Sequence, residues 1–201
     1  NLHFGNARRL SIHNVSWRRV MDMNDRALRD IVVGLGGKMN GMPRQSGFDI
    51  TAASEVMAIL CLSLSYAELM ERLGNILLGF KEDGEPFLAK ELNVQGAATA
   101  LLKEALLPNI VQTMENGPAL IHGGPFGNIA QGVNSILATK LALYTSDYII
   151  NEAGFGFDLG GEKFMDIVCP YGGFRPSGVV LVATVRALKM HGGGPRVVAG
   201  R

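Results

Sequence analysis

An unbroken apolar stretch late in the chain is the clearest element in the sequence. Residues 179–185 read Val-Val-Leu-Val-Ala-Thr-Val, which predicts a strand buried on both faces of a sheet. Shorter apolar runs at 119–122 and 147–152 predict two further strands, and residues 129–144 have the spacing of an amphipathic helix. A glycine-rich turn follows each run. The pattern therefore predicts an α/β fold with a doubly wound, mostly parallel sheet.

The first half of the chain predicts helices and a hairpin, which we interpret as insertions into that fold. Residues 15–33 are compatible with a helix, and residues 52–62 predict another. Ser65 and Glu68 match the capping-box pattern that opens a further helix. The apolar runs within 76–88 flank an Asp-Gly pair, which is typical of a β-hairpin.

These patterns divide the chain into three portions, all expected to belong to one larger protein. Residues 1–47 form an incomplete N-terminal segment with a helix and a glycine-rich loop. Residues 48–107 form a helical and hairpin portion, and residues 108–201 form an α/β portion with a nucleotide site.

The amino-acid composition limits the kinds of molecule that the protein is expected to bind. Hydrophobic residues make up 47% of the 201 residues and charged residues 18%, with a net charge of +1, so the sequence predicts neither a nucleic-acid nor a membrane partner. Cys61 and Cys169 lack the spacing of a metal or redox motif and predict buried thiols in a reducing compartment. No apolar run reaches the roughly 20 residues of a membrane span, and no leader is recognisable, so we expect a cytoplasmic protein.

The turn at 123–128 is a candidate anion site. Its glycines allow the backbone to approach a ligand, and the predicted helix that follows would direct backbone N–H groups at an anion. Phe126 can pack against a flat ring, and Asn128 can donate or accept hydrogen bonds. The alternative is a plain helix start that Asn128 caps.

Glu152 is the candidate metal ligand. It ends a predicted buried strand, where a carboxylate needs a partner. An acid at that place in phosphate-handling folds binds Mg²⁺ directly or through water. The alternative partner is a cation: Lys163, Arg175 or Arg186.

Two cations and a histidine follow the 179–185 run. Arg186 and Lys189 can neutralise a phosphoryl group, while His191 can serve as a base, a donor or a structural residue. The alternative is an ordinary surface exit with solvated charges. The sequence has no G-x-x-x-x-G-K-[ST] motif, so residue patterns alone predict a ligand-binding α/β domain with part of a phosphate site.

The run from Val182 to Gly193 closely resembles the second signature of the formate–tetrahydrofolate ligase family. Other segments resemble the same family in the same order along nearly the whole chain. They are Asn1–Phe4, Trp17–Arg26, Phe48–Ala58, Pro108–Glu115, His122–Phe126 and Glu152–Gly156.

The resemblance implies a P-loop NTPase-like fold and an ATP-dependent ligase of one-carbon metabolism. Formate would attack the γ-phosphate to give formyl phosphate, and N10 of tetrahydrofolate would capture the formyl group. The implied cofactors are ATP, Mg²⁺ and a monovalent cation, with tetrahydrofolate and formate as substrates and a homo-oligomeric assembly. The catalytic candidates are Arg186, Glu152 and His191, with Glu152 also the metal ligand. The cofactor-binding candidates are His122, Gly123, Gly124, Pro125, Phe126, Asn128, Gly154, Gly156 and Lys189.

Some positions differ from the family pattern. Gln131 stands where the family has His, Phe157 where a small residue is usual, and Pro170 where Arg is usual. The family carries its P-loop in a region that these residues do not match, so we expect a central fragment of such a ligase. The alternative function is a non-catalytic fragment or subunit that binds nucleotide or folate weakly, or supports assembly.

Overall fold

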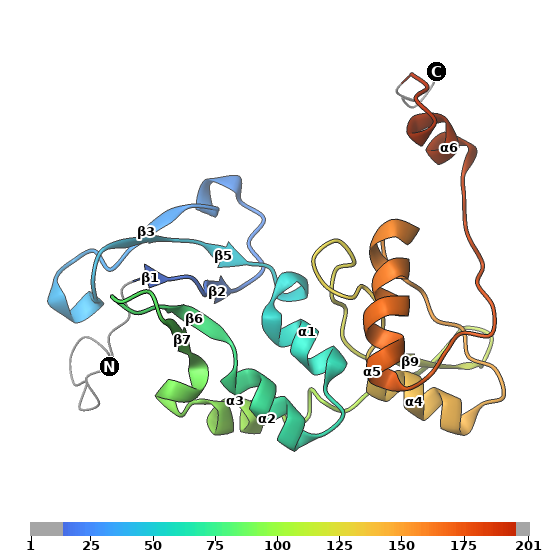
Figure 1. Cartoon of the computed structure of the whole chain (residues 1–201), viewed down its shortest axis with the longest axis horizontal. Coiled ribbons are helices and arrows are strands. Elements are labelled where there is room, and N and C mark those ends of the chain that lie inside the picture. Colours follow the sequence, from blue (N-terminus) through green and yellow to red (C-terminus); the bar gives the residue numbers. More distant parts are fainter. Residues whose placement is uncertain (1–13, 196–201) are drawn as a thin grey trace.

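The N-terminal half of the molecule is built on three small sheets (Figure 1). The computed structural model describes residues 14–195. Strand β6 (Leu77–Phe80) pairs antiparallel with β1 (Asn14–Val15) on one side and β7 (Pro86–Leu88) on the other. The other two sheets have two strands each: β2 (Arg19–Val20) with β5 (Phe48–Asp49) in parallel, and β3 (Ile31–Val33) with β4 (Arg44–Ser46) antiparallel.

The prediction of a helix within residues 15–33 is wrong. The segment instead forms strands and one 3-10 turn, η1 (Arg26–Leu28). Its backbone pairs with distant chain: the N–H groups of Ser16 and Trp17 donate to the Leu78 carbonyl, and that of Met21 donates to the Asp49 carbonyl. Long-range strand pairing therefore outweighs the helical spacing of its apolar residues.

The hairpin and the two helices predicted next are confirmed. Gly84 takes a φ of +86° in the β6–β7 turn, a conformation that glycine adopts without strain. Helix α1 (Glu55–Leu62) is capped by Ser54, whose hydroxyl accepts from the Met57 N–H at 3.1 Å. The hydroxyl of Ser65 caps α2 (Tyr66–Gly74) as the sequence predicts.

Helices α1 and α2 pack with the hairpin around the larger core. The turn η4 (Ala89–Leu92) and helix α3 (Gln95–Leu101) close that core. Its buried members are Leu60, Leu69, Leu73, Ile76, Leu78, Phe87, Ala89 and Leu106. Outside this core, Arg72 joins α2 to the C-terminal half because its guanidinium lies 5.1 Å from the centre of the Tyr171 ring.

The second half begins with an antiparallel hairpin and a helix. Strand β8 (Asn109–Gln112) pairs with β9 (Pro118–Ile121), which confirms the strand expected near 119. Helix α4 (Ile136–Thr145) starts seven residues later than expected, because residues 129–135 form a loop that ends in the Ser135 cap. A smaller core of Val133, Ile136 and Val168 lies beneath α4.

A helical stretch follows the extended segment and covers residues 157–172. It consists of the π-helical turns η5 (Phe157–Gly161) and η6 (Phe164–Val168) and then helix α5 (Cys169–Gly172). Pro170 lies in the first turn of α5, where a missing backbone N–H is tolerated.

The two apolar runs expected as inner strands of a parallel sheet are extended but form no strand pairs within residues 14–195. Ile150 and Val180 are almost fully exposed. The second run leads away from the body as an arm that carries α6 (Val185–His191), as Figure 1 shows. The described residues thus form a mixed α/β fold with small sheets, and a doubly wound parallel sheet is not among their elements.

Residues 185–191 are helical where the sequence predicted the end of a strand and an irregular exit. The Thr184 hydroxyl accepts from the Ala187 N–H at 3.1 Å and caps α6. The Ala-Leu-Lys-Met sequence that follows consists of strong helix formers.

Candidate functional site

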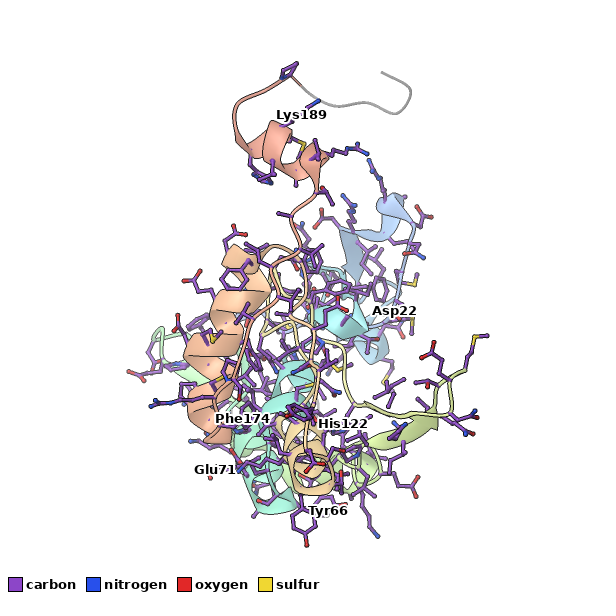
Figure 2. The ribbon with its side chains drawn as sticks, turned by 90° about the vertical axis from the view of Figure 1, so that its right-hand side faces the viewer. Asp22, Tyr66, Glu71, His122, Phe174 and Lys189 are labelled. Atoms are coloured by element: carbon purple, nitrogen blue, oxygen red, sulfur yellow. The ribbon has the colours of Figure 1, made fainter. Side chains whose placement is uncertain are left out.

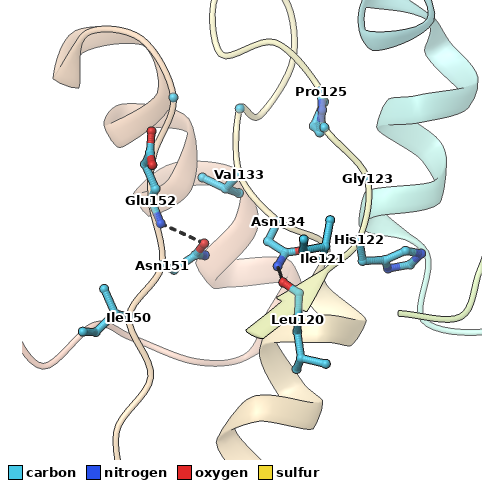
Figure 3. Close-up of a pocket in the computed structure, with 13 residues that line it drawn as sticks. Leu120, Ile121, His122, Gly123, Pro125, Val133, Asn134, Ile150, Asn151 and Glu152 are labelled. Atoms are coloured by element: carbon cyan, nitrogen blue, oxygen red, sulfur yellow. Dashed lines mark hydrogen bonds between the residues drawn. The ribbon is translucent and has the colours of Figure 1, made fainter. Parts of the chain in front are cut away.

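A cavity of about 380 Å³ lies between the end of β9 and the extended segment 150–154 (Figure 3). Its walls come from residues 120–125, residues 132–134 and the extended segment. The cavity wall therefore includes part of the 123–128 turn together with Glu152. Its volume is within the usual range of small-molecule pockets.

The turn at 123–128, which we call the anion turn, is anchored to the helical half of the molecule. Gly123 has a φ of +72°, and a Cβ atom there would lie 2.1 Å from the Cys61 sulfur. The Gly124 N–H lies 3.4 Å from the Met57 sulfur, and the Phe126 N–H donates to the Ala52 carbonyl at 3.1 Å. Helix α1 and the residues before it thus determine where the turn lies.

Four glycines bring three backbone segments into direct contact, and we call them the glycine junction: Gly127, Gly132, Gly154 and Gly160. A Cβ on Gly127 would lie 2.5 Å from the Gly154 carbonyl oxygen, and one on Gly160 would lie 2.1 Å from the same oxygen. A Cβ on Gly132 would lie 2.4 Å from the Gly127 Cα. The Gly154 N–H donates to the Gly132 carbonyl at 2.7 Å. No larger residue fits at these positions without a backbone shift.

His122 is a structural residue in this geometry. Its Nε2 lies 2.7 Å from the Ala105 carbonyl, which can only accept, so Nε2 carries the proton. In the neutral ring Nδ1, 2.5 Å from the Ser135 hydroxyl, accepts from that hydroxyl. Figure 3 shows the ring turned away from Glu152. Both ring nitrogens are therefore satisfied inside the protein, and the nucleotide contact predicted for His122 has no nitrogen available in this arrangement.

Ser135 joins this histidine to helix α4. Its hydroxyl oxygen also accepts from the Ala138 N–H at 3.0 Å, and its own N–H donates to the His122 carbonyl at 3.2 Å. The same buried serine thus caps α4 and fixes the end of β9, where the cavity begins.

Glu152 lies on the cavity wall and is exposed. Within residues 14–195 it forms no ion pair with Lys163 or Arg175. Lys163 instead donates to the Gly127 carbonyl at 2.7 Å. No cluster of three metal-ligating side chains occurs in the described part of the chain. A single carboxylate fits Mg²⁺ nonetheless, because this ion is commonly held by one or two carboxylates together with substrate phosphates.

Asn128 and Gly156 flank the glycine junction in exposed turns. The interpretation of Asn128 as a helix cap is wrong, since Ser135 caps α4.

Phe126 and Phe155 pack edge to face, with ring centres 5.9 Å apart. Phe155 holds a left-handed φ of +63°, which is unusual for an aromatic residue and typical of functional turns.

Arg186, Lys189 and His191 are not brought to the cavity. All three are exposed on α6, at the end of the arm, and Figure 2 shows Lys189 far from His122. The sequence predicted that they follow a strand at 179–185, and that segment forms no strand pair in the described residues.

The residues that differ from the family pattern fit without disruption. The Gln131 amide donates to the Ala58 carbonyl at 3.3 Å and is buried. Phe157 lies against Gly161, and half of its side chain is exposed, so it does not fill the cavity.

Several residues that shape the site were missed by the sequence interpretation. They are Ala52, Met57, Cys61, Gly132, Ser135 and Gly160. A signal existed for Ser135, because it directly precedes the apolar helix residue Ile136. The contacts of the others join residues distant in sequence, so local patterns cannot reveal them.

The fold and the cavity define a mixed α/β protein with a cavity beside glycine turns. Comparison with known families gives the specific assignment: the model of formate–tetrahydrofolate ligase matches residues 1–200. The chain belongs to the formate–tetrahydrofolate ligase family.

Two curated relatives agree with this assignment. The chain is 63% identical over 193 residues to the formate–tetrahydrofolate ligase of Syntrophus aciditrophicus (strain SB), covering 96% of this chain and 34% of that protein. It is 59% identical over 200 residues to the ligase of Paracoccus denitrificans (strain Pd 1222), covering 100% of this chain and 36% of that protein. The chain thus spans about a third of the length of these relatives. In the part of the chain that the structure describes, no helix is long and apolar enough to cross a membrane.

The buried cap at Ser135 gives a stability prediction. Ser135→Ala removes the α4 cap and leaves Nδ1 of His122 without a partner, so we expect a loss of about 2–4 kcal/mol in the free energy of unfolding. Ser65→Ala removes a solvent-exposed cap from α2 and is the matched control, with an expected loss of about 1 kcal/mol. Urea unfolding followed by circular dichroism measures both, and equal losses would contradict the His122–Ser135 link.

The thiol beneath the anion turn gives a chemical prediction. Burial raises the pKa of Cys61 from 9.0 to about 11, so at pH 8 the native thiol is about 100-fold less ionised than an unfolded one. We expect a disulfide reagent to modify Cys61 about 100-fold more slowly in the folded protein than in urea, with Cys61→Ser identifying the signal. Equal rates would show that Gly123 does not cover the thiol.

The raised pKa of Cys61 also makes the stability of the protein depend on pH. Below pH 9 both states keep the proton, whereas between about pH 9 and 11 only the unfolded thiol loses it. The free energy of unfolding therefore falls as the pH rises through that interval.

Proposed function

We propose that this chain forms part of an enzyme that joins formate to tetrahydrofolate with ATP. The observation that carries the proposal is the convergence of three family-like segments. Residues 122–125 and 152–154 contribute to the wall of one cavity. Residues 48–58, far from both in the sequence, contact the same turn through the Ala52 carbonyl and the Met57 sulfur. Chance similarity of short motifs gives no reason for such an assembly.

The chain's residues suit the binding of a phosphorylated substrate. The turn at 123–125 presents backbone without Cβ atoms at two positions, and Glu152 faces the same cavity. Glu152 would hold Mg²⁺ beside the phosphates, and the ion would supply the positive charge that stabilises phosphoryl transfer. Formyl phosphate as the intermediate belongs to this proposal. So do the roles of Gly154, which lines the cavity, and of Phe126 and Gly156, which are close to lining residues in the chain.

The cations on the arm need a different arrangement of the chain to take part. We propose that residues 147–152 and 179–184 are strands of a larger parallel sheet, of the P-loop NTPase-like type. In a protein as long as the two relatives, the other two-thirds of the chain would supply the strands that complete this sheet. Their apolar side chains are exposed in the described residues, which is unfavourable without such a partner. Pairing of 179–184 would bring Arg186, Lys189 and His191 to the edge of the sheet.

The proposal also covers the location, assembly and ion requirement of the enzyme. We place it in the cytoplasm as a homo-oligomer that uses a monovalent cation, and we keep the three-part division at residues 47 and 107. The second candidate is a non-catalytic segment that binds nucleotide weakly or supports assembly, which is favoured by the absence of a P-loop motif from these 201 residues.

The test is ATP- and formate-dependent formation of 10-formyltetrahydrofolate by the complete polypeptide that carries this segment. We expect Glu152→Gln to lower kcat by about 100-fold, since it removes the negative charge that holds the metal. Glu162→Gln, at an exposed position outside the cavity wall, is the matched control and should change kcat less than about twofold.

Each outcome separates the candidates. No product from the wild-type polypeptide, with MgADP still bound, would favour the non-catalytic segment. Product with equal kcat values for the wild type and Glu152→Gln would retain the ligase and remove Glu152 from its metal site.

A further inference from the structure

A partly buried cation lies against the glycine junction. Lys163 follows η5 after one residue, and its ammonium donates to the Gly127 carbonyl at 2.7 Å. Within residues 14–195 this ammonium forms no ion pair with a carboxylate. This partly buried cation therefore has one neutral acceptor, and an additional anionic partner would stabilise its charge.

The acidic residues close to Lys163 along the chain do not supply that pairing. Asp158 and Glu162 are both exposed, and the Asp158 carboxylate lies beside Gly156, where a Cβ would be 2.4 Å from its Oδ1. An ammonium has three N–H donors, and the Gly127 carbonyl accepts one of them. Two donors are therefore left for water or for a ligand oxygen.

The Lys163 ammonium is connected to the cavity through the glycine junction. Gly127, whose carbonyl it contacts, packs against Gly132 and Gly154, and both of these line the cavity. Lys163 is not part of the cavity wall, but its ammonium contacts the glycine that packs against two residues of that wall, which also includes Glu152. An anion in that cavity would be repelled by the Glu152 carboxylate, and a nearby ammonium would offset the repulsion.

We propose that Lys163 is an anion-binding residue, whose ammonium binds a phosphate oxygen at the glycine junction. The inference rests on the proposed function for the source of that phosphate, which is either a nucleotide or free phosphate released by the reaction. The recognition itself uses charge-assisted hydrogen bonds from Lys163 and backbone approach at glycine positions, chemistry that suits either source.

The experiment titrates inorganic phosphate and, separately, ADP into the complete polypeptide that carries this segment, and follows its amide nuclear magnetic resonance shifts at constant ionic strength. We expect phosphate to shift the amides of Gly127, Gly132 and Gly154. Lys163→Met should weaken phosphate binding by about tenfold or more. Lys140→Met removes the same charge from an exposed position on α4 and should leave the affinity unchanged. Lys163→Arg should retain most of the binding.

The outcomes are distinct. Shifts with phosphate alone identify free phosphate as sufficient, whereas shifts with ADP only identify the nucleotide as the source. Lys163→Met protein that binds as tightly as wild type would overturn the proposal, as would wild-type protein whose junction amides respond to neither ligand. If Lys163→Met unfolds, loss of binding in Lys163→Arg, with its native spectrum retained, would overturn it too. A ligase without activity but with Lys163-dependent phosphate binding would refute only the proposed function.

Discussion

Backbone-to-backbone contact at the glycine junction is the constraint on which the candidate site depends. Residues 127, 132, 154 and 160 come from three segments. A Cβ on Gly127, Gly154 or Gly160 would lie within 3 Å of another segment's backbone, and one on Gly132 would lie 2.4 Å from the Gly127 Cα. Interiors are packed too tightly to absorb such overlaps. Because these positions lack side chains, the loop before α4, the extended segment after it and η5 can meet beside one cavity.

Two further anchors fix the cavity from the other side. Ser135 satisfies His122 and caps α4 with the same hydroxyl, so the end of β9 and the start of the helix are positioned together. Gly123 covers the Cys61 thiol, and the Phe126 N–H donates to the Ala52 carbonyl. The helical half of the chain thus helps to position a site that the sequence placed entirely in the second half.

The parts of the structure that the sequence predicted correctly depend on local interactions. The β6–β7 hairpin follows from Asp83–Gly84, and the start of α2 follows from Ser65. The parts that it missed depend on distant partners. Residues 15–33 became strands because Leu78 and Asp49 accept their backbone hydrogen bonds, and residues 179–184 lack a neighbouring strand. The sequence likewise singled out Glu152 and the turn at 123–128 as candidates, whereas the sulfur, serine and lysine contacts around them arise only from tertiary packing.

The most direct test of this account compares Gly160→Ala with Gly124→Ala. A methyl group at position 160 would lie 2.1 Å from the Gly154 carbonyl oxygen, whereas at position 124 it meets no atom within 4 Å. We expect Gly160→Ala to lower the free energy of unfolding by about 2 kcal/mol and to speed amide exchange in residues 126–134 and 150–156. Gly124→Ala should change stability by less than about 0.5 kcal/mol. If both variants keep wild-type stability and exchange, the glycine junction does not hold the site together.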